Sequence, residues 1–335
     1  MNELQVVFGA TGALGSAVVR GLVAQGKPVL AVVRKEDKAE RFLPEDTEYS
    51  VADALDPDHV KFLCADAAVI YNCVHTRGDG WFSLTENLLS AARQSGARLV
   101  YPSNIHGYGP LQRTPATEDH PRLATSKRGV LRNAIEKMLL DARDAGDVQV
   151  CIPRLAGLYG PGVLESFLAQ ITEVALIGKT AYWYGKLDVP YDLVYVEDAA
   201  AACILLGNTA ELAEAENPVW HVPGPEPLTG RQFIELTFKT AGRKPSMGVR
   251  SRLMIQAIGA LTPAAKELAE VMYEFETPTL MDGSKLQATF PQFRYTPHQT
   301  GVQQAVEWMR EYRSEQTAGQ APEPSAAAAE PVERE

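Results

Sequence analysis

A glycine-rich turn close to the N-terminus is the feature that most restricts how this chain can fold. Gly9, Gly12 and Gly15 follow a short apolar segment at residues 4–8 and precede an amphipathic segment at residues 13–25. Glycines at this spacing let the backbone turn tightly out of a strand, and they let the following helix approach that strand closely. A second apolar segment at residues 29–33 completes the order strand, turn, helix, strand. The pattern predicts a parallel β-α-β unit.

The same alternation continues along the first half of the chain. Further strands are expected at residues 49–51, 67–73, 98–101 and 148–152, and further helices at residues 82–94 and 129–145. Strands that alternate with helices predict an α/β fold of the Rossmann type, a doubly wound parallel sheet with helices on both faces. Residues 1–160 are the expected Rossmann domain, to which segments near residues 190–225 return.

The alternation loosens beyond residue 160. Helical patterns near residues 163–177, 198–206, 230–240 and 262–275 predict a smaller, mostly helical C-terminal lobe over residues 161–313, which would bind substrate. The aromatic-rich segments 182–185 and 188–192 are expected either to line its pocket or to pack in its core. Residues 314–335 lack aromatic side chains and have little to bury, which predicts a disordered tail.

Composition and charge exclude several classes of protein. The formal net charge of −10 makes nucleic acid an unexpected partner. No apolar run is long enough to cross a bilayer, and the chain starts with a strand instead of a signal peptide. The four cysteines form no C-x-x-C pair and are expected to be buried thiols in a reducing compartment. Together these features predict a cytoplasmic protein without a membrane partner. The six histidines lack metal-ligand spacing, so no metal site is expected.

The glycine turn also predicts a ligand. Backbone N–H groups and the positive end of a helix dipole suit the pyrophosphate of a dinucleotide, and side chains at the turn would block its approach. The expected contacts come from Gly9, Thr11, Gly12, Ala13, Leu14 and Gly15. A tight turn without a ligand is the alternative. The strand before the turn and the helix after it favour the dinucleotide.

The end of the second expected strand indicates which dinucleotide is bound. An NAD site usually has an acidic residue there, which binds the ribose 2′-hydroxyl, whereas this chain has Arg34 and Lys35. Two cations suit a 2′-phosphate and favour NADP, with NAD as the alternative. Asp53, after the third strand, is expected either to accept a hydrogen bond from the adenine amino group or to cap a turn or helix.

These segments together resemble the short-chain dehydrogenase/reductase superfamily, in its extended NAD-dependent epimerase/dehydratase branch. The resemblance covers residues 4–240. Besides the glycine turn it rests on four segments at residues 51–53, 85–92, 158–162 and 195–200. It implies an NAD(P) cofactor and a small-molecule substrate. It also implies that two copies can form a homodimer through the helices at residues 82–94 and 129–145.

The catalytic positions of the family match poorly. Its members use a Ser or Thr, a Tyr that moves the proton, and a Lys that lowers the pKa of the Tyr. The family's serine position falls on Asn104. If Glu136 is matched to a glutamate of the family's helix, Arg128 takes the Tyr position and Arg132 the Lys position.

A second register of the same motif is also open. It matches Ser126 and Lys127 to the family's Ser-Lys pair and puts Leu123 at the Tyr position. Neither register supplies a phenol, and an arginine cannot act as an acid at a working pH. The pattern resembles the atypical subgroup of the superfamily, whose members keep the glycine turn and often lose the Tyr and Lys.

Other polar side chains could act near the nicotinamide. The candidates are Asn104, His106, Tyr108 and Lys127. Tyr108 is the proton donor with the most suitable chemistry, although a Tyr-Gly pair at this place in the family mostly packs a loop. Arg128 and Arg132 lie one helical turn apart and would suit an anionic group of a substrate, or else belong to a solvated helix face.

Two functions from different classes remain. The first is an NAD(P)-dependent oxidoreductase or epimerase/dehydratase-like enzyme that acts on a small carbonyl or alcohol metabolite. The second is a non-catalytic NAD(P)-binding protein, a redox sensor or regulator. The expected second lobe favours the enzyme, and the missing Tyr and Lys favour the sensor.

Overall fold

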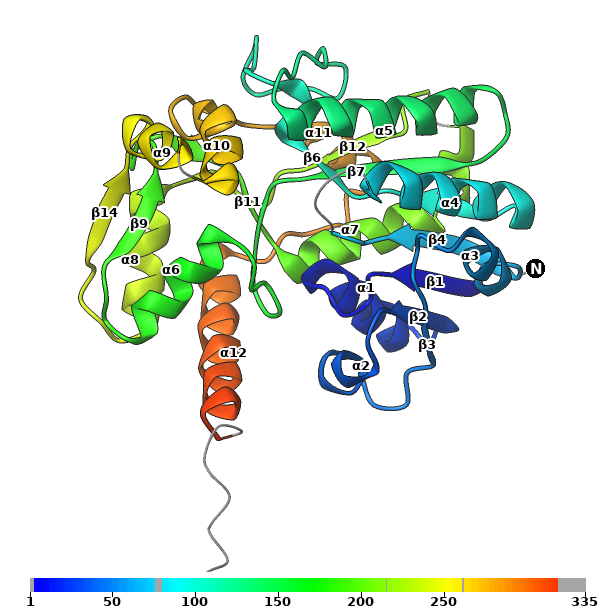
Figure 1. The fold of residues 1–335 in the computed structure, drawn as a ribbon, viewed down its shortest axis with the longest axis horizontal. Helices are drawn as coiled ribbons and strands as arrows, with labels where there is room; N and C mark the ends of the chain where they lie inside the picture. The colour runs from blue at the N-terminus through cyan, green and yellow to red at the C-terminus, as the bar shows by residue number, and fades with distance from the viewer. Residues whose placement is uncertain (1–2, 76–79, 215, 261, 319–335) are drawn as a thin grey trace, which may run out of the picture.

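The computed structural model describes residues 3–75, 80–214, 216–260 and 262–318, and within them eight parallel strands form one sheet (Figure 1). The strands are β1 (Leu4–Phe8), β2 (Val29–Val33), β3 (Tyr49–Val51), β4 (Ala67–Asn72), β5 (Arg98–Val100), β6 (Ser103–Asn104), β7 (Val150–Leu155) and β12 (Val219–Val222). Their order is β12-β7-β5-β4-β1-β2-β3, with β6 paired to β7. The progression reverses between β1 and β4, and open sheets of this type bind ligands at the carboxyl ends of the strands at that point.

Helices cover both faces of the sheet, which confirms the predicted doubly wound Rossmann-type fold (Figure 1). On one face lie α1 (Ala13–Ala24) and α7 (Val196–Asn208), and on the other α4 (Gly80–Ser95) and α5 (Lys127–Asp144). Each helix buries one apolar stripe. In α1 this stripe includes Val18 and Leu22, which are fully buried. Burial of such stripes on both faces is the main stabilisation of a layered α/β fold.

The second half of the chain builds a largely helical lobe beside the sheet (Figure 1). Its elements are α6 (Phe167–Leu176), β9 (Ala181–Tyr184), β10 (Pro190–Tyr191), β13 (Leu228–Thr229), α8 (Gly230–Thr240), β14 (Met247–Arg250), α9 (Arg252–Gly259), α10 (Pro263–Glu270), the 3-10 helix η3 (Met272–Phe275) and α12 (His298–Ala318). Trp183 is buried in its core, with ring centroids 5.1 Å from Phe167 and 6.3 Å from Phe275. The segment 182–185 therefore contributes Trp183 to the lobe core.

Several short elements complete the structure. They are α2 (Glu36–Phe42), α3 (Pro57–Leu63), the 3-10 helices η1 (Ile105–Tyr108) and η2 (Ala210–Glu214), the parallel pair β8 (Gly157–Tyr159) and β11 (Leu193–Tyr195), and α11 (Ser284–Thr289). Asp56 caps α3 by accepting hydrogen bonds from the backbone N–H groups of Asp58 and His59. Among the helices that the structure describes, none combines the length and the hydropathy that a bilayer crossing requires.

The lobe departs from the sequence-based expectation in two places. α12 extends to Ala318, so residues 314–318 of the predicted tail are helical, and the rest of that tail lies outside the described residues. The helix is held by burial of Val302, Val306 and Met309, a long-range effect that local composition does not reveal. The helix expected over residues 262–275 divides at Val271 into α10 and η3, which turns Glu274 towards the sheet.

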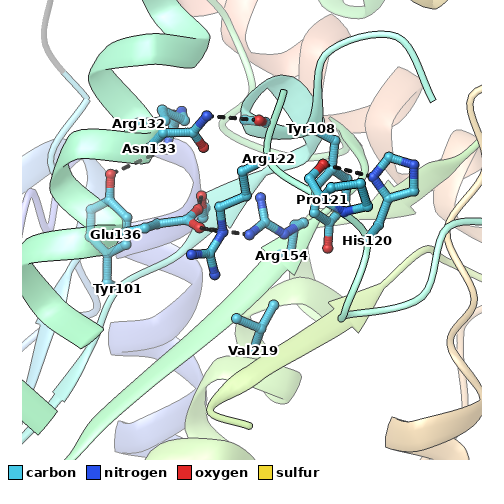
Figure 2. Close-up of polar contacts among 12 residues, drawn as sticks. Tyr101, Tyr108, His120, Pro121, Arg122, Arg132, Asn133, Glu136, Arg154 and Val219 are labelled. Atoms are coloured by element: carbon cyan, nitrogen blue, oxygen red, sulfur yellow. Dashed lines mark hydrogen bonds and ion pairs between the residues drawn. The ribbon is translucent and has the colours of Figure 1, made fainter. Parts of the chain in front are cut away.

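A buried ion pair joins the sheet to α5 (Figure 2). The carboxylate of Glu136 on α5 lies 2.7 Å from the guanidinium of Arg154 on β7, and both side chains are fully buried. Arg122 lies 3.1 Å from the same carboxylate, and the Ser103 hydroxyl donates to it at 2.5 Å. Burial raises the pKa of Glu136, but Arg154, the Ser103 hydrogen bond and Arg122 outweigh it, so the pKa is lowered overall. The carboxylate therefore stays charged inside the protein.

Removal of this charge should lower the free energy of unfolding more than removal of a surface charge on the same helix. Glu136→Gln leaves Arg154 buried without its counterion, which costs about 3–5 kcal/mol. Asp141→Asn is the matched control, because Asp141 pairs with Lys137 on the exposed face of α5 and such pairs contribute less than about 1 kcal/mol. Denaturant unfolding of both variants measures the difference. Equal effects would show that the buried pair does not stabilise the fold.

Candidate active site

A cavity of about 590 Å³ opens at the carboxyl ends of the central strands, where the strand order reverses. The glycine turn lines one part of it, and the segment from β6 to η1 lines another. Residues from the second lobe, including Tyr191, Asp192 and Met281, also contribute to its wall. The cavity therefore lies where a parallel α/β fold is expected to hold a ligand, between the sheet and the smaller lobe.

The glycine turn leaves its backbone open to that cavity. Gly9 has a φ of 74°, and a Cβ there would lie 2.7 Å from the backbone of Cys73. Gly12 is the N-cap of α1 and offers no side-chain cap, and the first turn has no acidic residue. The first N–H groups of a helix have no partner within it, so they remain available to an anion.

The structure separates the predicted cofactor contacts into two groups. Lining the cavity are Gly9, Thr11, Gly12, Ala13, Leu14, Arg34 and Asp53. Gly15 lies outside the lining, and a Cβ on it would overlap the Gly9 carbonyl, so this glycine is required for close packing of α1. Lys35 also lies outside the lining and is the N-cap of α2.

The segment that follows β2 contributes a further cation to the cavity, which the sequence analysis did not predict. Lys38 on α2 lines the cavity together with Arg34. Lys38 lies one helical turn beyond the N-cap of α2, and recognition of that short helix would have revealed it. Asp53 lines the cavity and also accepts a hydrogen bond from the Leu55 N–H at 3.0 Å. It therefore shapes the turn after β3 while it faces the cavity, and the helix cap is Asp56 instead.

At the other part of the cavity lie Asn104, His106 and Arg132. Asn104 is the N-cap of η1, and its side-chain oxygen accepts the His106 N–H at 3.1 Å. The backbone carbonyl of Asn104 accepts a 2.6 Å hydrogen bond from Arg154. The buried ion pair thus fixes the backbone that carries both Asn104 and His106.

Arg132 is a buried cation without a carboxylate partner. It is 7% exposed, its guanidinium lies 4.1 Å from the centroid of the Trp81 ring, and it donates to the Tyr101 hydroxyl at 3.4 Å (Figure 2). No Asp or Glu of the described chain lies within ion-pair distance of it. The Trp81 indole N–H is also buried and has no hydrogen-bond partner among the described residues. A buried cation without an ion pair and a buried N–H without an acceptor, both beside a cavity, are suited to an anionic or polar ligand.

Arg128 and Lys127 do not reach the cavity. Both are exposed at the first turn of α5. The Arg128 guanidinium pairs with Glu267 at 2.9 Å, and the Lys127 backbone N–H donates to Glu270, both on α10. Although Arg128 and Arg132 are one turn apart, only Arg132 lies deep enough to face the cavity.

Tyr108 is likewise not brought to the cavity. Its side chain is fully buried, and its hydroxyl lies 2.7 Å from Nε2 of His221, whose Nδ1 lies 3.1 Å from the Asp282 carbonyl. Burial and the Arg154 charge lower the pKa of His221 to about 3, so the ring is neutral. Nδ1 then donates to the carbonyl and Nε2 accepts from the phenol. The proton of Tyr108 is engaged in the core, as expected for a loop-packing tyrosine.

Titratable groups of other kinds also line the cavity. Burial raises the pKa of Asp192 to about 7, and one of its oxygens accepts the Met281 N–H at 2.7 Å. Burial raises the pKa of the Cys73 thiol to about 12, and all four cysteines are free. In the part of the chain that the structure describes, no group of three or more His, Cys, Asp or Glu side chains is arranged to hold a metal ion.

Comparison with known proteins identifies the family. A sequence model of the NAD dependent epimerase/dehydratase family matches residues 5–219. The chain belongs to this family. The resemblance predicted from the glycine turn and the four further segments is thereby confirmed.

Individual members of the family are more distant. The dTDP-6-deoxy-L-talose 4-dehydrogenase (NAD(P)(+)) of Kitasatospora kifunensis is 28% identical over 260 residues, which are 70% of this chain and 78% of that protein. The 2-alkyl-3-oxoalkanoate reductase of Stenotrophomonas maltophilia is 27% identical over 71% of this chain and 75% of its own. The fold matches the UDP-glucose 4-epimerase of Thermus thermophilus in complex with NAD, with a TM-score of 0.75 at 20% identity, over 92% of this chain and 99% of that one.

Replacement of the Tyr108 hydroxyl should affect stability and leave cofactor binding intact. Tyr108→Phe leaves Nε2 of His221 buried without its donor, which costs about 1–3 kcal/mol. Denaturant unfolding should detect this loss, and a fluorescence titration should give an NADPH dissociation constant within twofold of wild type. A stable variant that no longer oxidises NADPH would instead restore Tyr108 as the proton donor.

Proposed function

We propose that this chain is an NAD(P)-dependent oxidoreductase that acts on a small carbonyl or alcohol metabolite. The observation that carries the proposal is one cavity with two different parts. One part offers the N-terminus of α1, which has no side-chain cap, and the other offers Asn104, His106 and Arg132, which forms no ion pair with the described residues. A bound nicotinamide dinucleotide supplies or accepts a hydride. The protein's part is to bind, orient and exchange a proton with the reacting molecule.

The residues present fit such a dinucleotide. Gly9 and Gly12 leave room for phosphate oxygens against bare backbone, where a side chain would block them. Arg34 and Lys38 offer two cations at the end of β2, and Asp53, which follows the paired strand β3, lines the cavity with them. Cations at this place suit a ribose 2′-phosphate. We therefore propose a preference for NADP within a family described as NAD dependent.

Arg132 points to the substrate class. A buried guanidinium stacked on Trp81 and free of a carboxylate partner is suited to a carboxylate or phosphate of the bound molecules. The names of the two relatives described above mention a dTDP-sugar and an oxoalkanoate, compounds that carry phosphate or carboxylate groups. An anionic carbonyl compound is therefore the substrate we propose. Pairing of two copies through α4 and α5 stays a prediction.

The alternative function is a redox sensor that binds NAD(P) without turnover. The observation in its favour is the position of the family's tyrosine, which holds the exposed Arg128 if Glu136 and the family glutamate are aligned. The two functions differ in one measurable property, the consumption of NADPH.

The test is a substrate panel with a matched pair of arginine variants. Wild type with NADPH and acetoacetate, 4-nitrobenzaldehyde, simple ketones and dTDP-keto-sugars should lose absorbance at 340 nm with at least one compound. For an anionic substrate, Arg132→Gln should lower kcat/KM at least tenfold, whereas Arg128→Gln on the same helix should stay within twofold. Tight NADPH binding with no turnover of any compound would establish the sensor instead.

The cofactor preference has its own test. Arg34→Ala should weaken NADPH binding at least tenfold and leave NADH binding within threefold, because only NADPH carries the 2′-phosphate. Lys35→Ala is the control, since Lys35 lies outside the cavity lining, and it should change neither affinity by more than threefold. Calorimetric titrations of the three proteins measure both cofactors. Equal wild-type affinities for NADPH and NADH would refute the preference.

A further inference from the structure

The division of the helix expected over residues 262–275 brings a second-lobe carboxylate to the cavity wall. Glu274 on η3 is 1% exposed, and its Oε1 lies 2.6 Å from Nδ1 of His106 on η1. The His106 side chain is 23% exposed and lines the cavity. Its other ring nitrogen, Nε2, has no hydrogen-bond partner within the described residues. The pair therefore joins the two lobes and leaves one imidazole nitrogen available to a ligand.

The contact determines which ring nitrogen carries the exchangeable proton. A carboxylate accepts hydrogen bonds and cannot donate them, so Nδ1 carries a proton that it donates to Glu274. The hydrogen bond at Nδ1 fixes both the tautomer and the orientation of the ring. Nε2 then is the nitrogen that gains or loses a proton. An imidazole held by a carboxylate in this way can act as a general acid or base towards a substrate oxygen.

We propose that His106, oriented by Glu274, is the proton donor and acceptor of this active site, in the role that a tyrosine fills elsewhere in the family. This inference rests on the proposed oxidoreductase function. In the direction of reduction, the Nε2–H bond breaks and an O–H bond forms on the carbonyl oxygen, which has taken the C=O electron pair. A bound reduced nicotinamide would supply the hydride, whose two electrons form the new C–H bond at the carbonyl carbon, and solvent would return a proton to Nε2. Glu274 is a positioning residue, because it acts through His106.

Asp192 and Tyr191, two other acidic groups of the cavity lining, are the competing proton donors. Asp192 has one oxygen engaged by the Met281 N–H. Tyr191 stacks on Phe275 with ring centroids 5.3 Å apart, and burial, with further contributions from the nearby Glu274 and Asp192, raises the pKa of its phenol. Among the described residues, neither has a side-chain hydrogen-bond partner of the kind that Glu274 provides for His106.

The decisive variants are His106→Asn and Glu274→Gln, with His59→Asn on α3 as the control histidine outside the cavity lining. With NADPH and the panel compound that wild type reduces, His106→Asn should lower kcat at least 100-fold with KM within threefold. Glu274→Gln should lower kcat about tenfold, and His59→Asn should match wild type. NADPH dissociation constants and melting temperatures close to wild type verify that binding and fold persist.

A readout independent of turnover accompanies the kinetics. In protein labelled with ¹⁵N-histidine, the neutral His106 ring should carry its proton on Nδ1 in wild type and lose that preference in Glu274→Gln. A His106 ring protonated on Nε2 alone, or His106→Asn with more than a third of the wild-type kcat, would overturn the dyad and leave the oxidoreductase standing. Loss of kcat in Tyr191→Phe or Asp192→Asn with retention in His106→Asn would do the same. A wild type that binds NADPH and reduces no compound would overturn the proposed function and the dyad with it.

Discussion

The buried contact between Arg154 and Glu136 is the interaction on which both the fold and the reactive part of the cavity depend. Arg154 belongs to β7 and Glu136 to α5, so their 2.7 Å contact fixes the helix on the sheet. The same guanidinium holds the Asn104 carbonyl, while the carboxylate holds the Ser103 hydroxyl. Desolvation of two charges is costly and is offset only when the geometry is good and the remaining donors are engaged. The strand end that presents His106 is therefore positioned by contacts within the protein itself.

Much of the fold could be predicted because it depends on local patterns. The turn from β1 into α1 requires glycine at Gly9 because of its positive φ, and at Gly15 because α1 packs closely there. Both glycines belong to a spacing that can be recognised in the sequence alone. The alternation of apolar strands and amphipathic helices predicted the parallel sheet, and the strand order and the family match agree with it. The cofactor part of the cavity was accessible to the same reasoning, since a strand, a glycine turn and a helix form it without distant residues.

The reactive part could not be predicted, because it is assembled from distant segments. Helical spacing placed Arg128 and Arg132 on one face, but only tertiary packing decides that Arg128 meets α10 at the surface while Arg132 stacks on Trp81. The chemistry of a phenol favoured Tyr108 as a proton donor, but in the structure its hydroxyl forms a hydrogen bond with His221, 113 residues away. Glu274 was not predicted as a site residue, because the sequence pattern indicates one continuous helix over residues 262–275. Its contact with His106 spans 168 residues and arises only because that helix breaks at Val271.

We propose that one dinucleotide spans the cavity from the glycine turn to the segment that carries His106. Hydrogen exchange measured by mass spectrometry, with and without saturating NADPH, tests it most directly because it needs no knowledge of the substrate. If one dinucleotide contacts both segments, NADPH should slow amide exchange in peptides over residues 9–15 and 103–108 together. Slower exchange at the glycine turn alone, or at neither segment, would contradict it.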